Sequence, residues 1–295
     1  MPHSPSDPSQ MANTAEGRRA PGLRRVRIEE RSFAVALGDG GLGPFWDRVS
    51  AGGWEPQTFA VFRRFLRPGT SLVDVGAWIG PTALYGARLG ARVHAIEPDP
   101  AAHAELAANV AANPDLQERI VLHRLCIAAE SGPVKLYAGG MYAHPTSRFG
   151  DSMSGLLPTG DGTCQASHEV EGVSLADFMA AHAVGDCALI KMDVEGGEYA
   201  LIPGRWRALA PWGPPPLCVS FHAPAAAERE ALIGACLEEL AACYPVLIGA
   251  GDGAPIAVEA LARVRDWGDE DPASDWRRLE RRLGEGVVAS HAADG

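Results

Sequence analysis

Lysine is nearly absent from this chain: Lys135 and Lys191 are the only two among 295 residues. The formal net charge is −11 at pH 7. A nucleic-acid partner requires a basic protein face to neutralise phosphates, so this charge argues against one. The charge permits a cationic ligand without requiring it. It also makes a lysine inside an apolar stretch more noticeable.

Long hydrophobic runs are missing as well. No apolar run approaches the roughly 18 residues that a membrane-spanning helix needs. Residues 1–22 lack the apolar core of a secretory signal, and their Pro, Ser and charged residues are typical of a disordered tail. The six cysteines form no C-x-x-C pair, which favours reduced thiols over disulfides or zinc. We therefore expect a cytoplasmic protein without a membrane partner.

Strand and helix patterns alternate along the rest of the chain. Residues 23–66 are typical of a two-strand ribbon and a cap helix, residues 67–262 of the main domain, and residues 263–295 of a C-terminal helix and tail. Within the main domain, residues 119–128 are expected to form the third strand. Strands separated by helical patterns predict a mostly parallel α/β sheet with helices on both faces. Ligands bind such sheets at the carboxyl ends of the strands.

The stretch "VDVGAWIG" joins the first strand of this domain to its first helix, and Gly76 and Gly80 bracket the turn. A dinucleotide-binding turn follows the pattern G-x-G-x-x-G, in which the second glycine admits a pyrophosphate. Here Trp78 stands at that place, and its bulk disfavours a pyrophosphate. Asp74, inside the strand, adds negative charge, which favours a cationic or amino-bearing ligand.

An acid follows the second strand of the domain. Glu97 ends that strand, and Pro98 prevents it from continuing. A carboxylate at this place can accept hydrogen bonds from both ribose hydroxyls of a nucleoside. The alternative for Asp74 and Gly76 is a tight turn with a polar cap. The combination with Glu97 and the α/β alternation favours a nucleoside site.

The stretch "IKMDVEGGEYALI" places four charged residues between two apolar runs. Asp193 follows the strand expected over residues 187–192, where a carboxylate can accept a proton from a hydroxyl or orient an acceptor. Alternatively, Asp193 caps the next helix and the glutamates Glu195 and Glu198 complement its dipole; for Glu198 we favour this second role. Lys191 is expected to neutralise a nearby acid, because an unpaired buried charge is costly.

A histidine ends the following predicted strand. If this strand neighbours the one before Asp193, His222 and Asp193 emerge side by side, and either or both can act as the general base. A metal held by Asp193, Glu195 and His222 is conceivable, but nothing in the spacing requires one. Four other histidines, at positions 94, 103, 123 and 182, are expected to be structural or surface groups.

Residues 141–164 form a polar segment that is too long for a plain connector. The segment lies between the third and fourth strands of the domain and can fold over the strand ends. We expect it to contribute to an acceptor pocket, with Ser152, Met153 and Ser154 facing the cleft. The alternative is a disordered surface loop.

Three stretches, "LVDVGAWIG", "AIEPDP" and above all "IKMDVEGGEYALI", resemble the FkbM-type methyltransferases that use S-adenosylmethionine. The resemblance spans about residues 54–222, and the last stretch is its most specific part. It implies a class I methyltransferase fold, which is Rossmann-like, with a seven-stranded sheet whose last strand is antiparallel. It also implies methyl transfer to a hydroxyl of a small molecule or glycan, typically a natural product or a sugar.

The resemblance also implies a set of site residues. The residues expected to bind S-adenosylmethionine are Glu55, Asp74, Gly76, Ala77, Trp78, Gly80, Glu97, Pro98, Cys126, Ile127, Ala128 and Asp193, with those at 126–128 near the adenine. The expected catalytic residues are Asp193, His222 and Glu195. Trp54 and Glu55, before a proline-started helix, match a family element that closes over the cofactor. The alternatives are a nicotinamide-dependent oxidoreductase, which Trp78 disfavours, and a catalytically silent S-adenosylmethionine-binding protein.

Overall fold

The structure is a computed structural model, and it describes residues 22–38, 41–139, 148–150, 152–158, 166–222, 226–250, 253, 255–256, 279, 281–283 and 286–291. The N-terminal tail expected over residues 1–22 lies almost wholly outside these ranges. Within them, no helix combines the length and the apolar character that crossing a membrane requires.

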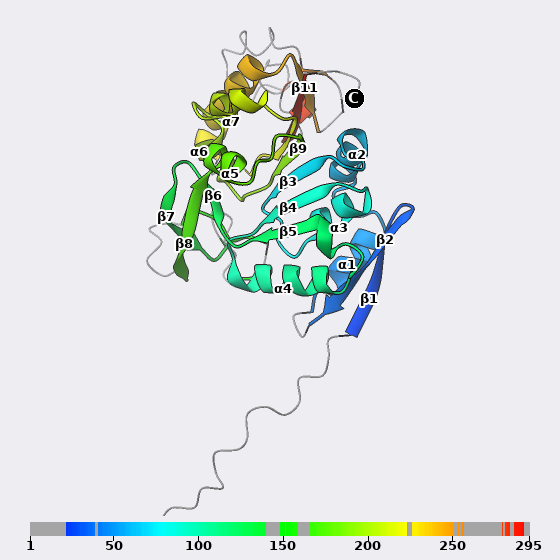
Figure 1. The fold of residues 1–295 in the computed structure, drawn as a ribbon. Helices are drawn as coiled ribbons and strands as arrows, with labels where there is room; N and C mark the ends of the chain where they lie inside the picture. Colours follow the sequence, from blue (N-terminus) through cyan, green and yellow to red (C-terminus); the bar gives the residue numbers. More distant parts are fainter. Residues whose placement is uncertain are drawn as a thin grey trace, which may run out of the picture.

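An eight-stranded mixed sheet forms the centre of the molecule (Figure 1). In spatial order its strands are β12 (Pro255–Ile256), β11 (Val246–Gly249), β13 (Gly286–Ser290), β10 (Leu217–Ser220), β9 (Cys187–Met192), β3 (Ser71–Val75), β4 (Arg92–Ile96) and β5 (Ile120–His123). The five strands from β10 to β5 are parallel. β13 runs antiparallel to both of its neighbours.

Helices cover both faces of this sheet, as the alternation along β3 requires. Leu72 packs in one apolar cluster, whereas Val73 and Val75 pack in another on the opposite face. The first cluster includes α1 (Gly43–Ser50), α2 (Pro56–Phe65), α3 (Pro81–Arg88) and α4 (Pro100–Ala111). The second includes α5 (Leu175–Ala181), α6 (Glu198–Leu201), α7 (Ala226–Cys243) and the 3₁₀ helix Trp206–Trp212. A further 3₁₀ turn, Gln117–Arg119, precedes β5.

The N-terminal ribbon is an antiparallel hairpin of β1 (Gly22–Ile28) and β2 (Arg31–Leu37). Two asparagines, one in α4 and one just after it, accept hydrogen bonds from backbone N–H groups at the β2 edge of this hairpin. The backbone N–H groups of Ala34 and Ala36 donate to the Oδ1 atoms of Asn113 and Asn109, each at 2.8 Å. These bonds hold the ribbon, and α1 behind it, against the main domain.

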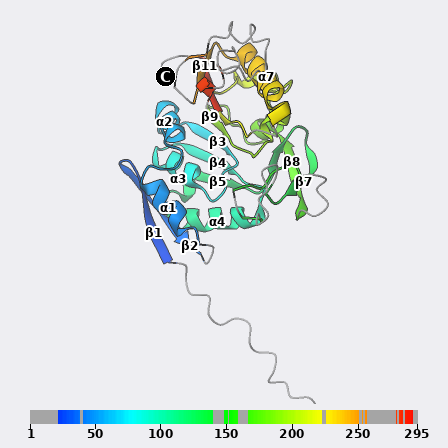
Figure 2. The ribbon, with the colours of Figure 1, turned by 180° about the vertical axis from the view of Figure 1, so that it is seen from behind.

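The expected third strand is wrong, because residues 119–128 form two strands in different sheets. β5 belongs to the main sheet, whereas β6 (Cys126–Ala128) joins a three-stranded sheet with β8 (Ser167–Ser174) and β7 (Gly132–Tyr137). Figures 1 and 2 show β7 and β8 on the side of the molecule away from α2. A mainly apolar stretch, read as one strand, does not reveal that its pairing partner changes at His123 and Arg124.

In the C-terminal region, expected to be a helix and tail over residues 263–295, the described residues 279 and 281–283 are helical, but a strand follows them. Residues 286–290 form β13, in which every residue is buried. The main sheet therefore has eight strands rather than seven, and its last strand in chain order is antiparallel. The short apolar stretch was overlooked because both of its partner strands lie far away in the sequence.

Candidate active site

A cavity of about 280 Å³ lies where the chain leaves β3, β4 and β9. Parallel strands bring their carboxyl ends to one edge of a sheet, so three separate turns meet here. These turns supply Gly76, Ala77, Trp78, Glu97, Pro98, Lys191, Asp193, Val194 and Glu195 to the cavity wall. The first cavity, as we call it, therefore unites most of the residues that the sequence predicts for a ligand site.

Gly76 allows two of these turns to touch. Its φ is +78°, and a Cβ atom at this position would lie 1.9 Å from the backbone oxygen of Asp193. The N–H groups of Gly76 and Ala77 both donate to the carbonyl of Ile96, at 3.1 and 3.0 Å. Only glycine fits here, because any side chain would separate the end of β3 from the end of β9.

Trp78 fixes one wall of the first cavity. Its backbone adopts φ 48°, and its N–H donates to Glu97 Oε2 at 2.9 Å. The indole Nε1 donates to the carbonyl of Gly150 at 3.2 Å, and the ring packs edge-on against Phe45 with centroids 4.7 Å apart. The residue that replaces the expected glycine thus joins the turn to α1 and to residues 148–150.

Glu97 is buried and lines the first cavity. Its two oxygens accept the N–H groups of Trp78 at 2.9 Å and Asp99 at 2.8 Å. A carboxylate offers about four acceptor positions, so each oxygen keeps one for a ligand hydroxyl. Burial, helped by the charge of Asp99, raises the pKa of Glu97 to about 7, against the opposing effect of the two hydrogen bonds.

Asp99 does more than cap a helix. One oxygen caps α4, accepting from the N–H groups of Ala101 and Ala102 at 2.8 and 3.1 Å. The other oxygen accepts from Gly150 N and Ser154 Oγ, both at 2.7 Å. Asp99 therefore holds part of the polar segment over the first cavity.

Of the polar segment over 141–164, the structure describes residues 148–150 and 152–158. Ser152 and Ser154 line the first cavity, as does Leu156. Met153, which we expected beside them, is not among the residues that line it.

Lys191 lies in an apolar strand, where it compensates two buried or partly buried acids. Its Nζ donates to the carbonyl of Gly76 at 2.7 Å and lies 3.4 Å from Asp74 Oδ1 and 3.5 Å from Asp193 Oδ2. Burial alone would lower the pKa of Lys191, but the charges of Asp74 and Asp193 outweigh it and raise the pKa. The ammonium group compensates both acids and ties β9 to the turn after β3.

Three carboxylates surround the imidazole of His222. Its Nε2 lies 3.2 Å from Asp193 Oδ1 and 3.8 Å from Glu195 Oε1. Its Nδ1 lies 3.1 Å from Oε1 of Glu198, which is fully buried. Glu198 also accepts the N–H groups of Val194 and Gly196, at 3.1 and 3.0 Å. This buried carboxylate orients the imidazole and directs its other nitrogen to Asp193 and Glu195.

This charge distribution sets the protonation of the cluster. Burial alone would lower the pKa of His222, but the hydrogen bond to Glu198 and the charge of Asp193 raise it to about 9. Burial raises the pKa of Glu195 to about 7, with the charge of His222 opposing this and that of Asp193 adding to it. Without a ligand, His222 is therefore an imidazolium at neutral pH. Asp193, Glu195 and His222 also place one ligand atom each within 4.8 Å of one another, and a metal ion bound there would have to displace the proton of His222.

A second cavity, of about 830 Å³, opens on the other side of His222. It shares Glu55, Asp193 and His222 with the first cavity. Its remaining wall comes mainly from α2, β10, β11 and β13 and is largely apolar, with Ala60, Val61, Val219, Phe221, Ile248, Val287 and Val288. The two cavities thus meet at the residues that can move a proton.

Glu55 stands at the junction of the two cavities. It precedes α2 with a left-handed backbone, at φ 41°. Its Oε2 atom is buried and has no hydrogen-bond partner among the described residues. Burial, together with the charge of Asp193, raises the pKa of Glu55 to about 7. A buried carboxylate oxygen without a partner favours a ligand that carries an amino group or a positive charge.

Three predicted site residues do not line the first cavity. Asp74 is fully buried beneath it, where it accepts the hydroxyl of Thr82 at 2.7 Å. Gly80 packs against α4, because a Cβ atom there would lie 2.5 Å from Leu106 Cδ1. Ala128 pairs with Ser174 in the small sheet, whereas Cys126 and Ile127 do reach the cavity.

Sequence reasoning missed Phe45 and Arg48 of α1 and Leu136 of β7, which also line the first cavity. α1 and β7 lie outside the βα turns on which the prediction was based. No motif marks these residues, since they reach the cavity only through the packing of α1 and the small sheet.

Comparisons with known proteins bear on this site. Comparison with curated proteins found no match. Among solved structures, the chain is similar to a methyltransferase FkbM from Methylobacillus flagellatus KT, at 20% identity, over 60% of this chain and 42% of that chain, with a TM-score of 0.34. The chain is also similar to a SAM-dependent methyltransferase from Agrobacterium tumefaciens, at 16% identity, over 37% of this chain and 34% of that chain, with a TM-score of 0.27. A third similar structure is a possible exported protein from Bordetella parapertussis, at 17% identity, over 64% of this chain and 51% of that chain, with a TM-score of 0.30.

The matched part of the chain spans about half or less of the length of each of these structures. A family model described as the methyltransferase FkbM domain matches residues 74–243, which is more than half of this chain. The matched range begins within β3 and ends with α7, so it includes the turns after β3, β4 and β9 and the residue His222. This confirms the resemblance drawn from the sequence, and the chain belongs to the FkbM methyltransferase family.

Proposed function

We propose that this chain is an S-adenosylmethionine-dependent O-methyltransferase that methylates a hydroxyl of a natural product or a sugar. The observation that carries the proposal is the meeting of two cavities at Glu55, Asp193 and His222. A methyltransferase needs separate compartments for its methyl donor and its acceptor, with a proton acceptor where they join.

The first cavity has the chemistry that S-adenosylmethionine requires. Glu97 keeps acceptor positions for the two ribose hydroxyls, and Cys126 and Ile127 offer an apolar surface for an adenine. Glu55 supplies an unpartnered buried oxygen for the amino group at the other end of the cofactor. The order of the parallel strands and the antiparallel β13 support a class I methyltransferase fold for this site.

The second cavity is the proposed acceptor site. Its wall is largely apolar, which suits an acceptor with an apolar body, and Arg64 and Ser220 add polar groups. This assignment changes the role of the polar segment, because its described residues Ser152 and Ser154 line the first cavity rather than the second. We propose that the segment covers the cofactor.

The Asp193–His222 pair is the proposed proton acceptor. When bound, S-adenosylmethionine supplies an electrophilic methyl group, and a hydroxyl that attacks it must lose its proton. His222 points Nε2 to Asp193 and is held from behind by Glu198. A cationic ligand in the first cavity lowers the pKa of His222, since like charges disfavour the imidazolium. Such base assistance contributes about 10²- to 10⁴-fold to the rate.

Two other functions remain distinguishable from this one. A nicotinamide-dependent oxidoreductase is disfavoured by Trp78, whose indole is fixed beside the turn where a pyrophosphate would bind. A catalytically silent cofactor-binding protein would not need His222 between three carboxylates. The cytoplasm is the proposed location, consistent with the free thiols at positions 126, 187, 218, 236 and 243.

A two-step experiment tests the proposal. Thermal shift with S-adenosylmethionine, S-adenosylhomocysteine and NAD should show stabilisation by the first two compounds alone. Stabilisation by NAD alone would contradict the proposed cofactor. Methyl transfer from isotope-labelled cofactor to a panel of hydroxylated metabolites then separates an enzyme from a silent binding protein. Absence of transfer to every acceptor class, despite tight cofactor binding, favours the silent protein.

A further inference from the structure

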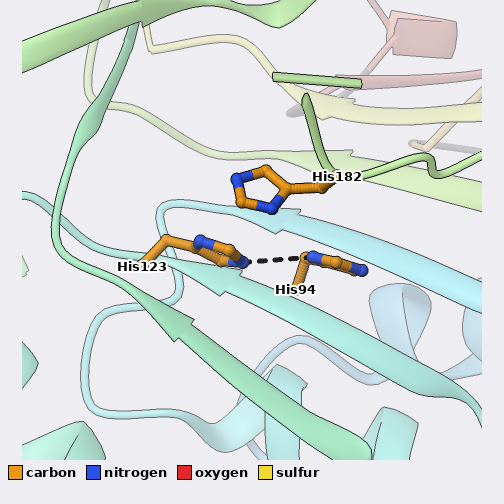
Figure 3. Close-up of side chains that lie close together, drawn as sticks. All are labelled: His94, His123 and His182. Atoms are coloured by element: carbon orange, nitrogen blue, oxygen red, sulfur yellow. Dashed lines mark hydrogen bonds between the residues drawn. The ribbon is translucent and has the colours of Figure 1, made fainter. Parts of the chain in front are cut away.

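Three histidines lie together outside both cavities. His94 belongs to β4, His123 ends β5, and His182 follows α5 (Figure 3). The sequence suggested only structural or surface roles for them. His94 and His123 are buried, whereas His182 is exposed. The cluster therefore has two fixed members and one that reaches solvent.

The rings are arranged so that their nitrogens converge. His94 Nδ1 and His123 Nε2 share a hydrogen bond of 3.1 Å, which a bound ion would replace, and the two rings are nearly parallel, at 13°. Figure 3 shows the imidazole of His182 above this pair, and its ring centroid lies 4.5 Å from that of His123. One nitrogen of each ring lies within 4.8 Å of the other two.

These distances can be compared with those around a bound metal ion. Zinc bonds imidazole nitrogen at about 2.0–2.1 Å in a tetrahedral arrangement, which places two ligand nitrogens about 3.3 Å apart. His94 and His123 already have nearly this separation. The His182 nitrogen, which lies within 4.8 Å of the other two, must approach to about 3.3 Å to complete the same geometry, and its exposure leaves its side chain room to rotate.

We propose that His94, His123 and His182 bind a divalent transition-metal ion such as zinc, with the fourth coordination position open to solvent. The donor set selects the class of ion. Imidazole suits zinc, copper and nickel, whereas magnesium and calcium require oxygen ligands.

The charges around the cluster are mixed in sign. His182 and Arg92 act on His94 in one direction, and Asp186 acts on it more weakly in the other. His182, His94 and His103 all act on His123 in the same direction.

A bound ion would add a bond between parts of the fold that already touch through their aromatic rings. Phe178 of α5 packs against His123 and His182, with centroids 4.9 and 4.5 Å apart. A metal bond would fix the end of α5 to β4 and β5. The carbonyl of His123 accepts the N–H of Glu97 at 3.0 Å, so the same bond would also stiffen the turn that carries Glu97.

Zinc titration of the chelator-treated full chain tests the proposal. Calorimetry should show one zinc ion per chain, and zinc should raise the unfolding temperature. Loss of a group that only orients a metal ligand weakens metal binding by roughly 10- to 100-fold. Because His182 is proposed to bind the ion directly, His182→Gln should weaken zinc binding by more than this. This variant should fold normally, because its side chain is exposed.

Two matched variants complete the test. His291→Gln changes an exposed histidine outside the cluster, and His222→Gln changes the histidine among the carboxylates. Both should bind zinc as the unchanged chain does. Zinc binding that survives His182→Gln, that disappears in His222→Gln, or that is absent from the folded unchanged chain would overturn the proposal.

Discussion

At the scale of single residues, the site depends on a few buried charges that compensate one another. Lys191 contacts the carbonyl of Gly76 and lies close to Asp74 and Asp193, and Glu198 holds His222 from behind. A buried charge that loses its partner costs several kcal/mol, typically about 3–5. These residues therefore maintain both the shape of the turns and the protonation of the groups in the cavity.

Glu97→Ala should weaken cofactor binding. It removes the carboxylate proposed to accept the ribose hydroxyls and leaves the N–H groups of Trp78 and Asp99 without their acceptor. We expect a loss of about 1–3 kcal/mol in the binding of S-adenosylhomocysteine, measured by calorimetry. Glu118→Ala, at an exposed position, is the control and should bind normally. Equal affinities for both variants would contradict the ribose assignment.

Glu198→Gln should move the pH dependence of methyl transfer to lower pH. In the unchanged enzyme, kcat/KM should rise with pH with a midpoint near pH 9, where half of the His222 side chains have lost their proton, and should become constant at higher pH. Removing the negative charge of Glu198 destabilises the imidazolium, which lowers the pKa of His222, so the neutral base exists at lower pH.

The comparison needs both variants to be folded, which unfolding temperatures establish. His222→Gln should lose this pH dependence and about 10²- to 10⁴-fold of the rate. A profile with the same midpoint in Glu198→Gln and the unchanged enzyme would rule out His222 as the base. Asp193→Asn would then be the variant to measure.

Much of the site could be predicted from the sequence, and the rest could not, for physical reasons. Gly76, Glu97 and Asp193 could be found because they follow strands whose apolar patterns are clear. Asp74 was assigned to the ligand, yet its carboxylate lies beneath the cavity against Lys191 and Thr82. The sequence indicates that Asp74 is buried, but it does not indicate which side of the turn its side chain occupies.

At the scale of helices and strands, α2 forms one wall of the second cavity and no part of the first. Its first residues follow Glu55 at the junction, and its exposed side faces the second cavity. β10, β11 and β13 form the opposite wall. A change on the exposed side of α2 should thus affect the acceptor and spare the cofactor.

Ala60→Trp should obstruct the second cavity. Ala60 lies on the exposed side of α2 and lines this cavity but not the first. An indole there should raise the KM of the acceptor about tenfold or more, which corresponds to about 1.4 kcal/mol, with unchanged affinity for S-adenosylhomocysteine. Phe65→Trp, on the same helix but lining neither cavity, is the control. Weaker binding of S-adenosylhomocysteine with an unchanged acceptor KM would contradict this assignment and would place the cofactor in the second cavity.

The elements themselves were predictable wherever local pattern decided them. The ribbon, α2, β3, α3, β4 and α4 agree with the sequence, helped by Pro56 and Pro81 at helix starts and by Asp99 at a helix cap. β6 and β13 were not predicted as separate strands, because both are defined by pairing with strands that lie far away in the sequence. Local sequence carries little information about which strand a short apolar segment will join.

At the scale of the whole molecule, four buried titratable groups act in the same direction on stability, and His94 and His123, whose pKa values are lowered, oppose them below pH 6.5. Glu55, Glu97 and Glu195 have pKa values raised from 4.5 to about 7, and that of His222 is raised from 6.5 to about 9. Between each pair of values the folded chain binds more protons than the unfolded chain. Stability therefore falls as pH rises through these windows.

Without ligand, the unfolding temperature should be higher near pH 5 than near pH 9. The contribution of His222 is complete below pH 6.5 and is lost as pH rises through 9, and the glutamates act in the same direction between 4.5 and 7. The net charge of −11 adds repulsion at high pH. Calorimetric scans across this range measure the trend, and Glu195→Gln should flatten its acidic half. A temperature that increased from pH 5 to 9 would contradict this account.

β13 lies between β10 and β11 although it follows both in the chain. A ribosome adds about 5–20 residues per second, so β10 and β11 emerge ahead of the strand that joins them by a few seconds. During that interval both strands expose unpaired edges, which chaperones can cover. The wall of the second cavity cannot form until translation has passed Ser290. A nascent chain therefore has the family's sequence motifs well before it has a compartment for its acceptor.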